Sequence, residues 1–515
     1  MVMRRYDLAA AIICVAMTVL ALVIGHFHEV GAFGVETDFY GAYAIQATNI
    51  MEGRPYTYQH NPPGYVLLLA AVSSATGDLF VAGKLISAVA SGLFGGLTYL
   101  LFKALFGSPI ALAVMMLSLV ALIPHSFLAA TDVVGATLVI LALWVFLGRP
   151  VRTLSRCFLT GLLAGAAYLV RANAIFVLVG VGFSLIAINL DQESVRKRLV
   201  KAVFFGVGAL LLLGPWLLVN WQTNGTPFAS TAYLQVAAHF YHPLSDTVGT
   251  TLGQMASEFS SFWDVLVRDP AMVAARWAKD VLFWNPMRLS TEVLRFPAYL
   301  FAGAGLLRVL NDLAPQRRAY LLVCVLGYLL LGLVGFGVRY YLFLFPLLFL
   351  LVVAGLFQRD SMDERRGVRV FGAVSGGFVL MVLIAVSGLH AFRTAKETLA
   401  SEPRYLLEPA AMLQARSSPS DVMIVRKPHL AYLAGLQRVF PLEETAEGFL
   451  LKAKELGARY IVYSDAEAQH WPGLKSLRDP VALPDTFRLV YRNPATNTLV
   501  YEIDRGPLVL GDMVR

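Results

Sequence analysis

The sequence contains few charged residues for its size. Only 15% of its 515 residues are Asp, Glu, Lys or Arg, and 57% are hydrophobic, whereas soluble domains carry roughly 25% charged residues. The mean hydropathy is +0.64. This composition excludes an ordinary soluble globular protein.

Cysteine and repeated motifs are also scarce. The three cysteines, Cys14, Cys157 and Cys324, lie in or beside apolar segments, which excludes a disulfide framework and a cysteine-based zinc cluster. The sequence shows no internal repeat or heptad pattern, which excludes solenoids and coiled coils. The C-terminal part has no Gly-rich phosphate loop, so we assign it no nucleotide chemistry.

Long apolar runs dominate the first three quarters of the chain. Segments of about 17–25 apolar residues can cross a bilayer as helices, and they recur here from Leu8 to His390. The first is expected to remain as an uncleaved helix, because no clear Ala-x-Ala site follows it. We therefore expect a polytopic α-helical membrane protein with about 11 transmembrane helices, near residues 8–25, 79–102, 110–128, 134–148, 157–170, 174–190, 202–221, 297–310, 319–336, 340–357 and 370–389.

The net charge of +8 reports membrane topology rather than nucleic-acid binding, since Lys and Arg cluster in alternate short links between apolar runs. With these links in the cytoplasm, the N-terminus is cytoplasmic and the C-terminal part is periplasmic or extracellular. The basic links contain Arg4 and Arg5, Lys103, Arg149, Arg152 and Arg156, Arg196, Lys197, Arg198 and Lys201, Arg308, Arg317 and Arg318, and Arg359, Arg365, Arg366 and Arg369.

Two domains are expected. Residues 1–390 form the membrane domain, with external loops at 26–78 and 222–296, and residues 391–515 form a small soluble α/β domain. In the second, strands are expected at 422–425, 459–464, 488–491 and 498–503, with a helix at 445–457. In the first loop, helical spacing of apolar residues predicts an interfacial helix over 39–50, with Gln46 on another face.

Two acids are candidates for chemistry on the external side. Asp38 precedes the interfacial helix, where a carboxylate could act as a general base or bind a divalent cation. Asp132 opens a predicted span on the same side. For both, helix capping is the simpler alternative, with Thr37 or Asp38 as one cap and Thr131 or Asp132 as the other.

Three basic residues are exceptions to the rule that Lys and Arg concentrate on the cytoplasmic side. Arg171, Arg339 and Lys84 fall at predicted external helix ends, where an anionic phosphate would explain them; snorkelling toward ordinary lipid headgroups is the alternative. His60, before Pro62-Pro63-Gly64, could donate a hydrogen bond to sugar or phosphate or simply form a turn. His239 and His242 are expected to be polar loop residues rather than zinc ligands.

The chain resembles polytopic glycosyltransferases that use polyprenyl-phosphate sugars, such as protein mannosyltransferases, aminoarabinose transferases and rhizobial lipopolysaccharide sugar transferases. The resemblance rests on D-x-Y-x-x-x-A, EG-x-PY and NPPGY within residues 38–65, on YLVRAN and VRYYLFLFPLL around Arg171 and Arg339, and on VRKPHLAYLAG and LGARYIVY in the tail.

This resemblance implies the C-type glycosyltransferase fold in a bacterial inner (plasma) membrane, and inverting transfer of a sugar to a cell-envelope lipid, glycan or protein. Asp38 would be the catalytic acid and Asp132 the second acid. The residues that bind the phosphate of the donor would be Arg339, Arg171, Lys84, His60 and Tyr340. A divalent cation, Mg²⁺ or Mn²⁺, could assist at Asp38 and Asp132.

The sequence departs from the family pattern at two positions. Phe39 stands where many members have a second acid, and Asn61 stands where aminoarabinose transferases have a lysine before the proline pair. The second departure argues against carrying over that donor. Two other functions stay open: a transporter or flippase for a lipid-linked sugar, and a noncatalytic accessory subunit of glycan assembly.

Overall fold

The computed structural model describes residues 2–58, 60–242, 255–311, 314–335, 337–357, 366–439, 443, 445–469 and 472–504, with the backbone alone for 2–4 and 366–374. The predicted cytoplasmic residues Arg359 and Arg365 lie outside these ranges. Contacts divide the chain into two compact units, which we name the membrane unit (Met1–His28, Gln46–Phe240 and Ser261–Ala400) and the C-terminal unit (Glu29–Ile45, Tyr241–Ser260 and Ser401–Arg515). Residues 29–45 of the first predicted loop thus belong to the C-terminal unit.

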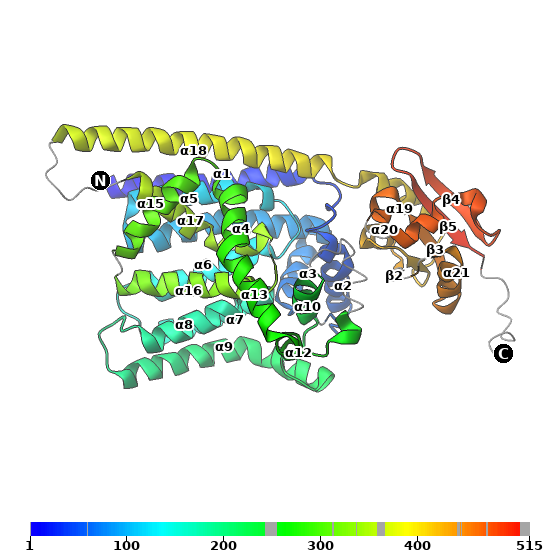
Figure 1. The fold of residues 1–515 in the computed structure, drawn as a ribbon, viewed down its shortest axis with the longest axis horizontal. Helices are drawn as coiled ribbons and strands as arrows, with labels where there is room; N and C mark the ends of the chain where they lie inside the picture. The colour runs from blue at the N-terminus through cyan, green and yellow to red at the C-terminus, as the bar shows by residue number, and fades with distance from the viewer. Residues whose placement is uncertain are drawn as a thin grey trace. The chain divides into compact units, whose positions relative to one another are not determined.

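The membrane unit is helical, and a helix lies at each predicted span. Those helices are α1 (Val2–His26), α4 (Leu79–Phe106), α5 (Ser108–Leu122), α6 (Asp132–Leu147), α7 (Leu154–Val170), α8 (Ile175–Ala187), α9 (Val195–Asn224), α15 (Ala298–Asn311), α16 (Pro315–Leu331), α17 (Phe345–Leu356) and α18 (Arg366–Ala400). Figure 1 shows α8, α9, α16 and α18 running nearly parallel, and α8 contacts both α9 and α16.

Shorter elements connect these helices. They are α2 (Ala44–Met51), α3 (Gly64–Thr76), η2 (Ile123–His125), η3 (Ala172–Ala174), α10 (Tyr233–Tyr241), α12 (Phe262–Arg268), α13 (Pro270–Lys279), η4 (Asp280–Trp284), α14 (Asn285–Arg288), η5 (Leu289–Leu294) and η6 (Val338–Leu344).

Length and hydropathy support a membrane location. In the described part of the chain, 6 helical segments are long and apolar enough to cross a bilayer, and the bent pair Pro270–Leu294 and Ala298–Asn311 would make 7. Four further apolar helices are shorter. Large apolar side chains cover the outer faces of α1 and α9, as at Leu8, Val15 and Leu211. Such faces suit lipid rather than water, so the chain is a multi-pass membrane protein.

Charged side chains connect the helix ends. At one end of α4, Lys103 Nζ lies 2.6 Å from Asp7 Oδ1 on α1. At the other end, Lys84 Nζ donates to the carbonyls of Gly25 at 2.8 Å and His28 at 2.6 Å. These contacts make α1 and α4 antiparallel, as alternating topology requires.

The predicted interfacial helix is present but differs in detail. It begins as a π-helical turn, η1 (Phe39–Tyr43), and continues as α2. Gln46, predicted on another face than the apolar residues, is also buried. Its side chain is buried because Nε2 donates to Thr57 Oγ1 at 3.0 Å and Oε1 accepts from the Thr57 amide at 2.9 Å.

The C-terminal unit contains a five-stranded mixed sheet in the order β2-β1-β3-β5-β4. β1 (Val422–Ile424) pairs in parallel with β2 (Gln437–Val439) and β3 (Ala458–Tyr463), while β5 (Thr498–Ile503) runs antiparallel between β3 and β4 (Phe487–Asn493). Its helical elements are η7 (Arg404–Leu406), α19 (Leu407–Gln414), α20 (Pro428–Leu433), α21 (Ala446–Glu455), α22 (Asp465–Ala468), η8 (Pro472–Leu477) and η9 (Pro480–Ala482).

Side chains on each face of this sheet form a separate core. One face contributes Ile461 and Tyr501, which pack with Phe449 of α21. The other contributes Tyr460 and Val500, which pack with residues of α19 and α20. The predicted α/β character of the tail is confirmed, whereas the short strand β2 was not predicted.

Candidate functional site

The closest pairing of sequence candidates joins Asp132 and Arg171. Arg171 Nη1 lies 2.5 Å from Asp132 Oδ1, and both side chains are largely buried, with 16% and 4% exposed. Nη1 also donates to Thr131 Oγ1 at 2.8 Å. Neither Thr131 nor Asp132 caps α6 with its side chain. Asp132 therefore pairs with a cation, and the capping alternative is not realised.

Local packing positions this pair. Arg171 breaks from helical geometry at the end of α7, with φ −152° and ψ 111°. Its stem crosses α6 at Gly135, where an added Cβ would lie 3.3 Å from Arg171 Cβ. The start of α6 is held against α4, because Ser87 Oγ donates to the Leu128 carbonyl at 2.6 Å. Small residues and helix-end hydrogen bonds thus let Arg171 reach Asp132.

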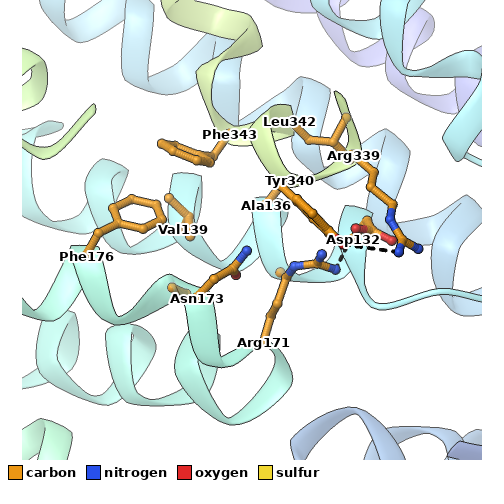
Figure 2. Close-up of a pocket in the computed structure, with 12 residues that line it drawn as sticks. Asp132, Ala136, Val139, Arg171, Asn173, Phe176, Arg339, Tyr340, Leu342 and Phe343 are labelled. Atoms are coloured by element: carbon orange, nitrogen blue, oxygen red, sulfur yellow. Dashed lines mark hydrogen bonds and ion pairs between the residues drawn. The ribbon is translucent and has the colours of Figure 1, made fainter. Parts of the chain in front are cut away.

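Tyr340 and Arg339 complete the cluster from η6. The guanidinium carbons of Arg171 and Arg339 lie 5.0 and 5.1 Å from the Tyr340 ring centre, within the range of cation–π attraction. Arg339 Nη2 also donates to the Tyr340 hydroxyl at 3.3 Å. Figure 2 shows the four side chains converging. We name Asp132, Arg171, Arg339 and Tyr340 the arginine–aspartate cluster.

The pocket at this cluster is small. It encloses about 20 Å³, which is room for about one water molecule. Two guanidinium groups and one carboxylate line it. A phosphate that approached Arg171 Nη1 would compete with the Asp132 carboxylate, which lies 2.5 Å from it. His125, which the sequence did not single out, lies within electrostatic range of Asp132 and Arg339.

The Pro-Pro-Gly motif has a packing role beside this cluster. Gly64 opens α3 against the end of α7, and an added Cβ would lie 2.6 Å from the Leu169 carbonyl carbon. Real Cβ atoms essentially never approach so closely, so any other residue would force α3 and α7 apart. Leu169 is two residues before Arg171, which links the motif to the position of the cluster.

Gly64→Ala is accordingly expected to destabilise the protein by about 1–3 kcal/mol through overpacking and to weaken binding at the cluster. Thermal unfolding and donor binding in lipid nanodiscs would measure both effects. Gly206→Ala on α9 is the control, since an added Cβ there meets nothing within 4 Å. Equal behaviour of the two variants would contradict the packing role.

Asp38 lies in the C-terminal unit as described above. It precedes η1 with helical backbone angles, its side chain makes no capping hydrogen bond, and it is exposed. Thr37 Oγ1 instead accepts from the Gly34 amide at 3.1 Å. The capping alternative therefore fails at this position too, and the Asp38 carboxylate is accessible for other chemistry.

Lys427 is a residue that sequence reasoning missed. Its amine donates to Thr37 Oγ1 at 3.2 Å, lies 5.7 Å from the Phe33 ring centre, and is within electrostatic range of Asp38. The segments around the two residues pack together, with Tyr40 of η1 4.6 Å from the His429 ring of α20. The VRKP motif, which contains Lys427, could have singled this residue out. No local pattern in the sequence, however, indicates that residue 427 contacts residue 37.

Further titratable groups are buried behind Lys427. Burial raises the pKa of Glu467 to about 7, against the opposing pull of Arg426 and of the Lys427 amide, which donates to Oε1 at 3.1 Å. Burial, together with the charge of Arg426, lowers the pKa of Lys427, and Glu467 and Asp38 partly offset this. Burial likewise lowers the pKa of His429 to about 3, so its imidazole is neutral.

The other predicted donor ligands have structural partners. Lys84 binds the carbonyls at the end of α1, as described above. His60 Nδ1 lies 3.3 Å from Thr231 Oγ1, and its carbonyl accepts from Ser230 Oγ at 3.1 Å. Their roles toward a ligand remain predictions, and the structure brings neither into the arginine–aspartate cluster.

Metal binding finds little support in the donor set. Among the described residues, no three His, Cys, Asp or Glu side chains gather to hold an ion. Asp132 is the one carboxylate in the cluster and is paired with Arg171, whereas Mg²⁺ and Mn²⁺ prefer several oxygen ligands. The residues there do not fit a divalent cation.

His239, expected to be a loop residue, lies in α10 with Nε2 2.9 Å from Asp280 Oδ2.

Comparison with known sequences matches one family. Residues 60–219 match the profile of the Dolichyl-phosphate-mannose-protein mannosyltransferase family. This range contains Asp132 and Arg171 but neither Asp38 nor Arg339. No curated protein sequence is significantly similar to the chain.

Several solved structures share the fold over nearly the whole chain. ArnT from Cupriavidus metallidurans bound to undecaprenyl phosphate has a TM-score of 0.54 at 13% identity, covering 95% of this chain and 97% of its own. The Archaeoglobus fulgidus oligosaccharyltransferase in complex with Zn and sulfate has a TM-score of 0.60 at 15% identity, covering 94% of this chain and 72% of its own. AglB from the same organism, in complex with an inhibitory peptide and a dolichol-phosphate, has a TM-score of 0.58 at 14% identity, covering 97% and 75%. The chain therefore has the fold of the polytopic C-type glycosyltransferases.

Proposed function

We propose that this protein is a membrane glycosyltransferase that moves a sugar from a polyprenyl-phosphate donor to a cell-envelope acceptor, with inversion at the anomeric carbon. The transferred group is a hexose or pentose. The acceptor is a lipid, a glycan or a protein, and transfer takes place on the external face of a bacterial inner membrane. The N-terminus is cytoplasmic in this proposal, in keeping with the distribution of Lys and Arg.

The observation that carries the proposal is the arginine–aspartate cluster at the helix ends. Two arginines around one tyrosine ring, in a membrane unit, provide the planar donors that phosphate groups prefer. In this structure a carboxylate already lies against Arg171, which is the contact that a phosphate oxygen would make. The match over residues 60–219 and the shared fold support the same donor class, since relatives carry undecaprenyl phosphate or dolichol-phosphate.

The reaction then assigns a role to each residue. Asp38 accepts the proton of the acceptor hydroxyl while the hydroxyl oxygen forms a bond to the anomeric carbon. The bond from that carbon to the phosphate oxygen breaks, and the polyprenyl phosphate leaves with the electron pair. Arg171 and Arg339 stabilise the developing charge. Asp132 orients Arg171 and is displaced from it when the phosphate binds.

Lys427 positions the Asp38 segment in this proposal. Lys427→Met, which keeps the hydrocarbon stem but removes the donor to Thr37, is expected to lower kcat about ten- to hundredfold, because small misplacements of a catalytic group are costly. Donor KM is expected to change little, and Lys427→Arg to restore part of kcat. These constants would be measured by label transfer.

The control for this variant is Lys452→Met on α21, whose amine pairs with Glu455 at 2.9 Å on the surface of the same unit. We expect it to leave both constants unchanged. A loss of kcat in Lys452→Met, or no loss in Lys427→Met, would remove the positioning role.

One experiment tests the function itself. The full chain in nanodiscs would be incubated with a panel of radiolabelled polyprenyl-phosphate sugars and a crude envelope extract, and label would be followed into the acceptor fraction. Transfer establishes the enzyme and names the sugar. Specific donor binding without transfer would instead favour the transporter or accessory alternative.

A further inference from the structure

A second pocket lies in the C-terminal unit, on the sheet face covered by α19. It encloses about 310 Å³, within the range of about 300–1,000 Å³ typical of ligand sites. Its floor includes Tyr460 and Glu502, which are paired across β3 and β5, and its wall includes Arg488, which is paired with Glu502 across β5 and β4. Side chains from three neighbouring strands therefore face the same space.

Three arginines line this pocket. They are Arg459 of β3, Arg488 of β4 and Arg416, which follows α19 and is exposed. We name these residues the arginine pocket. Leu413 of α19 adds an apolar edge. None of these residues enters the mechanism proposed above.

Glu502 holds two of the arginines at a fixed spacing. Arg459 Nη2 lies 2.9 Å from Glu502 Oε1, and Arg488 Nη2 pairs with the other carboxylate oxygen. Arg459 Nη1 also binds Asp421 Oδ2 at 2.8 Å. Burial would raise the pKa of Glu502, but the hydrogen bonds from Arg488 and Arg459 hold it below its usual value, so Glu502 is ionised at neutral pH.

The residues that line the pocket carry more positive than negative charge: three guanidinium groups and one carboxylate, Glu502. Two further carboxylates lie beside the arginines, since Asp421 pairs with Arg459 and Asp504 is within electrostatic range of Arg488. Arg488 keeps 70% of its side chain exposed and Arg459 keeps 31%, so both can reach a ligand. Guanidinium groups held in place by a carboxylate are prearranged for bidentate contact with an anion.

We propose that the arginine pocket binds an anionic sugar residue of the acceptor, one that carries a carboxylate or a phosphate. The assignment of this sugar to the acceptor rests on the proposed function, whereas the binding of an anionic sugar is argued from the pocket alone. The concave shape and the volume favour a single sugar-sized group over a flat membrane surface. The C-terminal unit then contributes to acceptor selection through these arginines.

Binding of defined probes tests the proposal. The full chain, in nanodiscs of zwitterionic phosphatidylcholine, would be titrated calorimetrically with glucuronate, glucose 6-phosphate, inorganic phosphate and glucose. We expect the two anionic sugars to bind and glucose not to bind. Binding of inorganic phosphate as tight as that of the sugars would reduce the site to a simple anion site and overturn the sugar assignment.

Two variants assign the binding to this pocket. Arg416→Gln and Arg488→Gln leave the Arg459 pairs with Asp421 and Glu502 intact, and each is expected to weaken anionic sugar binding at least about tenfold. Arg492→Gln on β4 is the matched control, because Arg492 is exposed and pairs with Leu499, whose side chain belongs to the core on the opposite face. Equal weakening in all three variants, or none in the first two, would overturn the proposal.

Transfer assays separate this proposal from the proposed function. If transfer occurs, Arg416→Gln should raise KM for an anionic acceptor about tenfold and leave kcat and donor KM unchanged. If no transfer is found but the anionic sugars still bind through Arg416 and Arg488, the proposed function fails and the binding site stands. If transfer occurs and Arg416→Gln changes no constant, the arginine pocket is not an acceptor site.

Discussion

Asp38→Asn is expected to lower the rate of sugar transfer about 100- to 10,000-fold, which is the usual contribution of a general base. The amide keeps the size of the side chain but cannot accept the proton of the acceptor hydroxyl. Because Asp38 is exposed and caps no helix, the substitution removes no capping hydrogen bond, although it removes the favourable charge of Asp38 near the partly buried Lys427 amine. Folding and donor affinity should therefore change little, and the loss should fall on kcat.

Glu52→Gln provides the matched control for this prediction. Glu52 lies in the same predicted external loop, and its side chain is 55% exposed beside Arg54, so the same change of charge is made away from the proposed base. Single-turnover label transfer would be measured for both variants and for the wild type. If Asp38→Asn keeps more than half of the wild-type rate, Asp38 is not the base, whatever the enzyme transfers.

The second large effect is expected at the arginine–aspartate cluster. Arg339→Gln should weaken donor binding about ten- to hundredfold, since a charge-assisted hydrogen bond contributes about 1.5–3 kcal/mol. Arg171→Gln should do the same and should also destabilise the protein by about 3–5 kcal/mol, because it leaves Asp132 buried without its cation.

A double variant separates these two consequences of losing Arg171. In Asp132→Asn with Arg171→Gln, no charge is left buried, so thermal stability should return toward the wild-type value while donor affinity stays low. Donor binding and thermal unfolding in nanodiscs would be measured together. Arg149→Gln, an exposed position in a basic link, is the control for the change of charge. Wild-type donor affinity in both Arg339→Gln and the double variant would remove the cluster as the phosphate site.

The membrane architecture could be predicted largely from the sequence. Every expected span overlaps a helix, because a bilayer demands long apolar segments with internally satisfied backbone groups. The strands at 498–503 and 459–464 were also found within a residue of their predicted bounds. Both signals are local: they depend on the order of apolar residues over one element.

The candidate site was only partly predictable. The unusual positions of Arg171 and Arg339 identified them as candidates, but their common contact with Tyr340 depends on how η6 and α7 pack. At Asp132 the sequence left metal or acid–base chemistry and helix capping as alternatives and did not predict the ion pair with Arg171 at 2.5 Å. The burial of Gln46 was not predicted because its partner, Thr57, lies in a following segment that helical periodicity does not describe.

The sequence by itself determined that this is a multi-pass membrane protein with an α/β tail, because hydropathy and strand alternation are properties of neighbouring residues. Only the tertiary structure decided which distant side chains meet. Lys427 reaches Thr37 across 390 positions, and Arg416, Arg459 and Arg488 gather from a helix end and two strands. Such contacts are set by the packing of whole elements, which no single segment of sequence encodes.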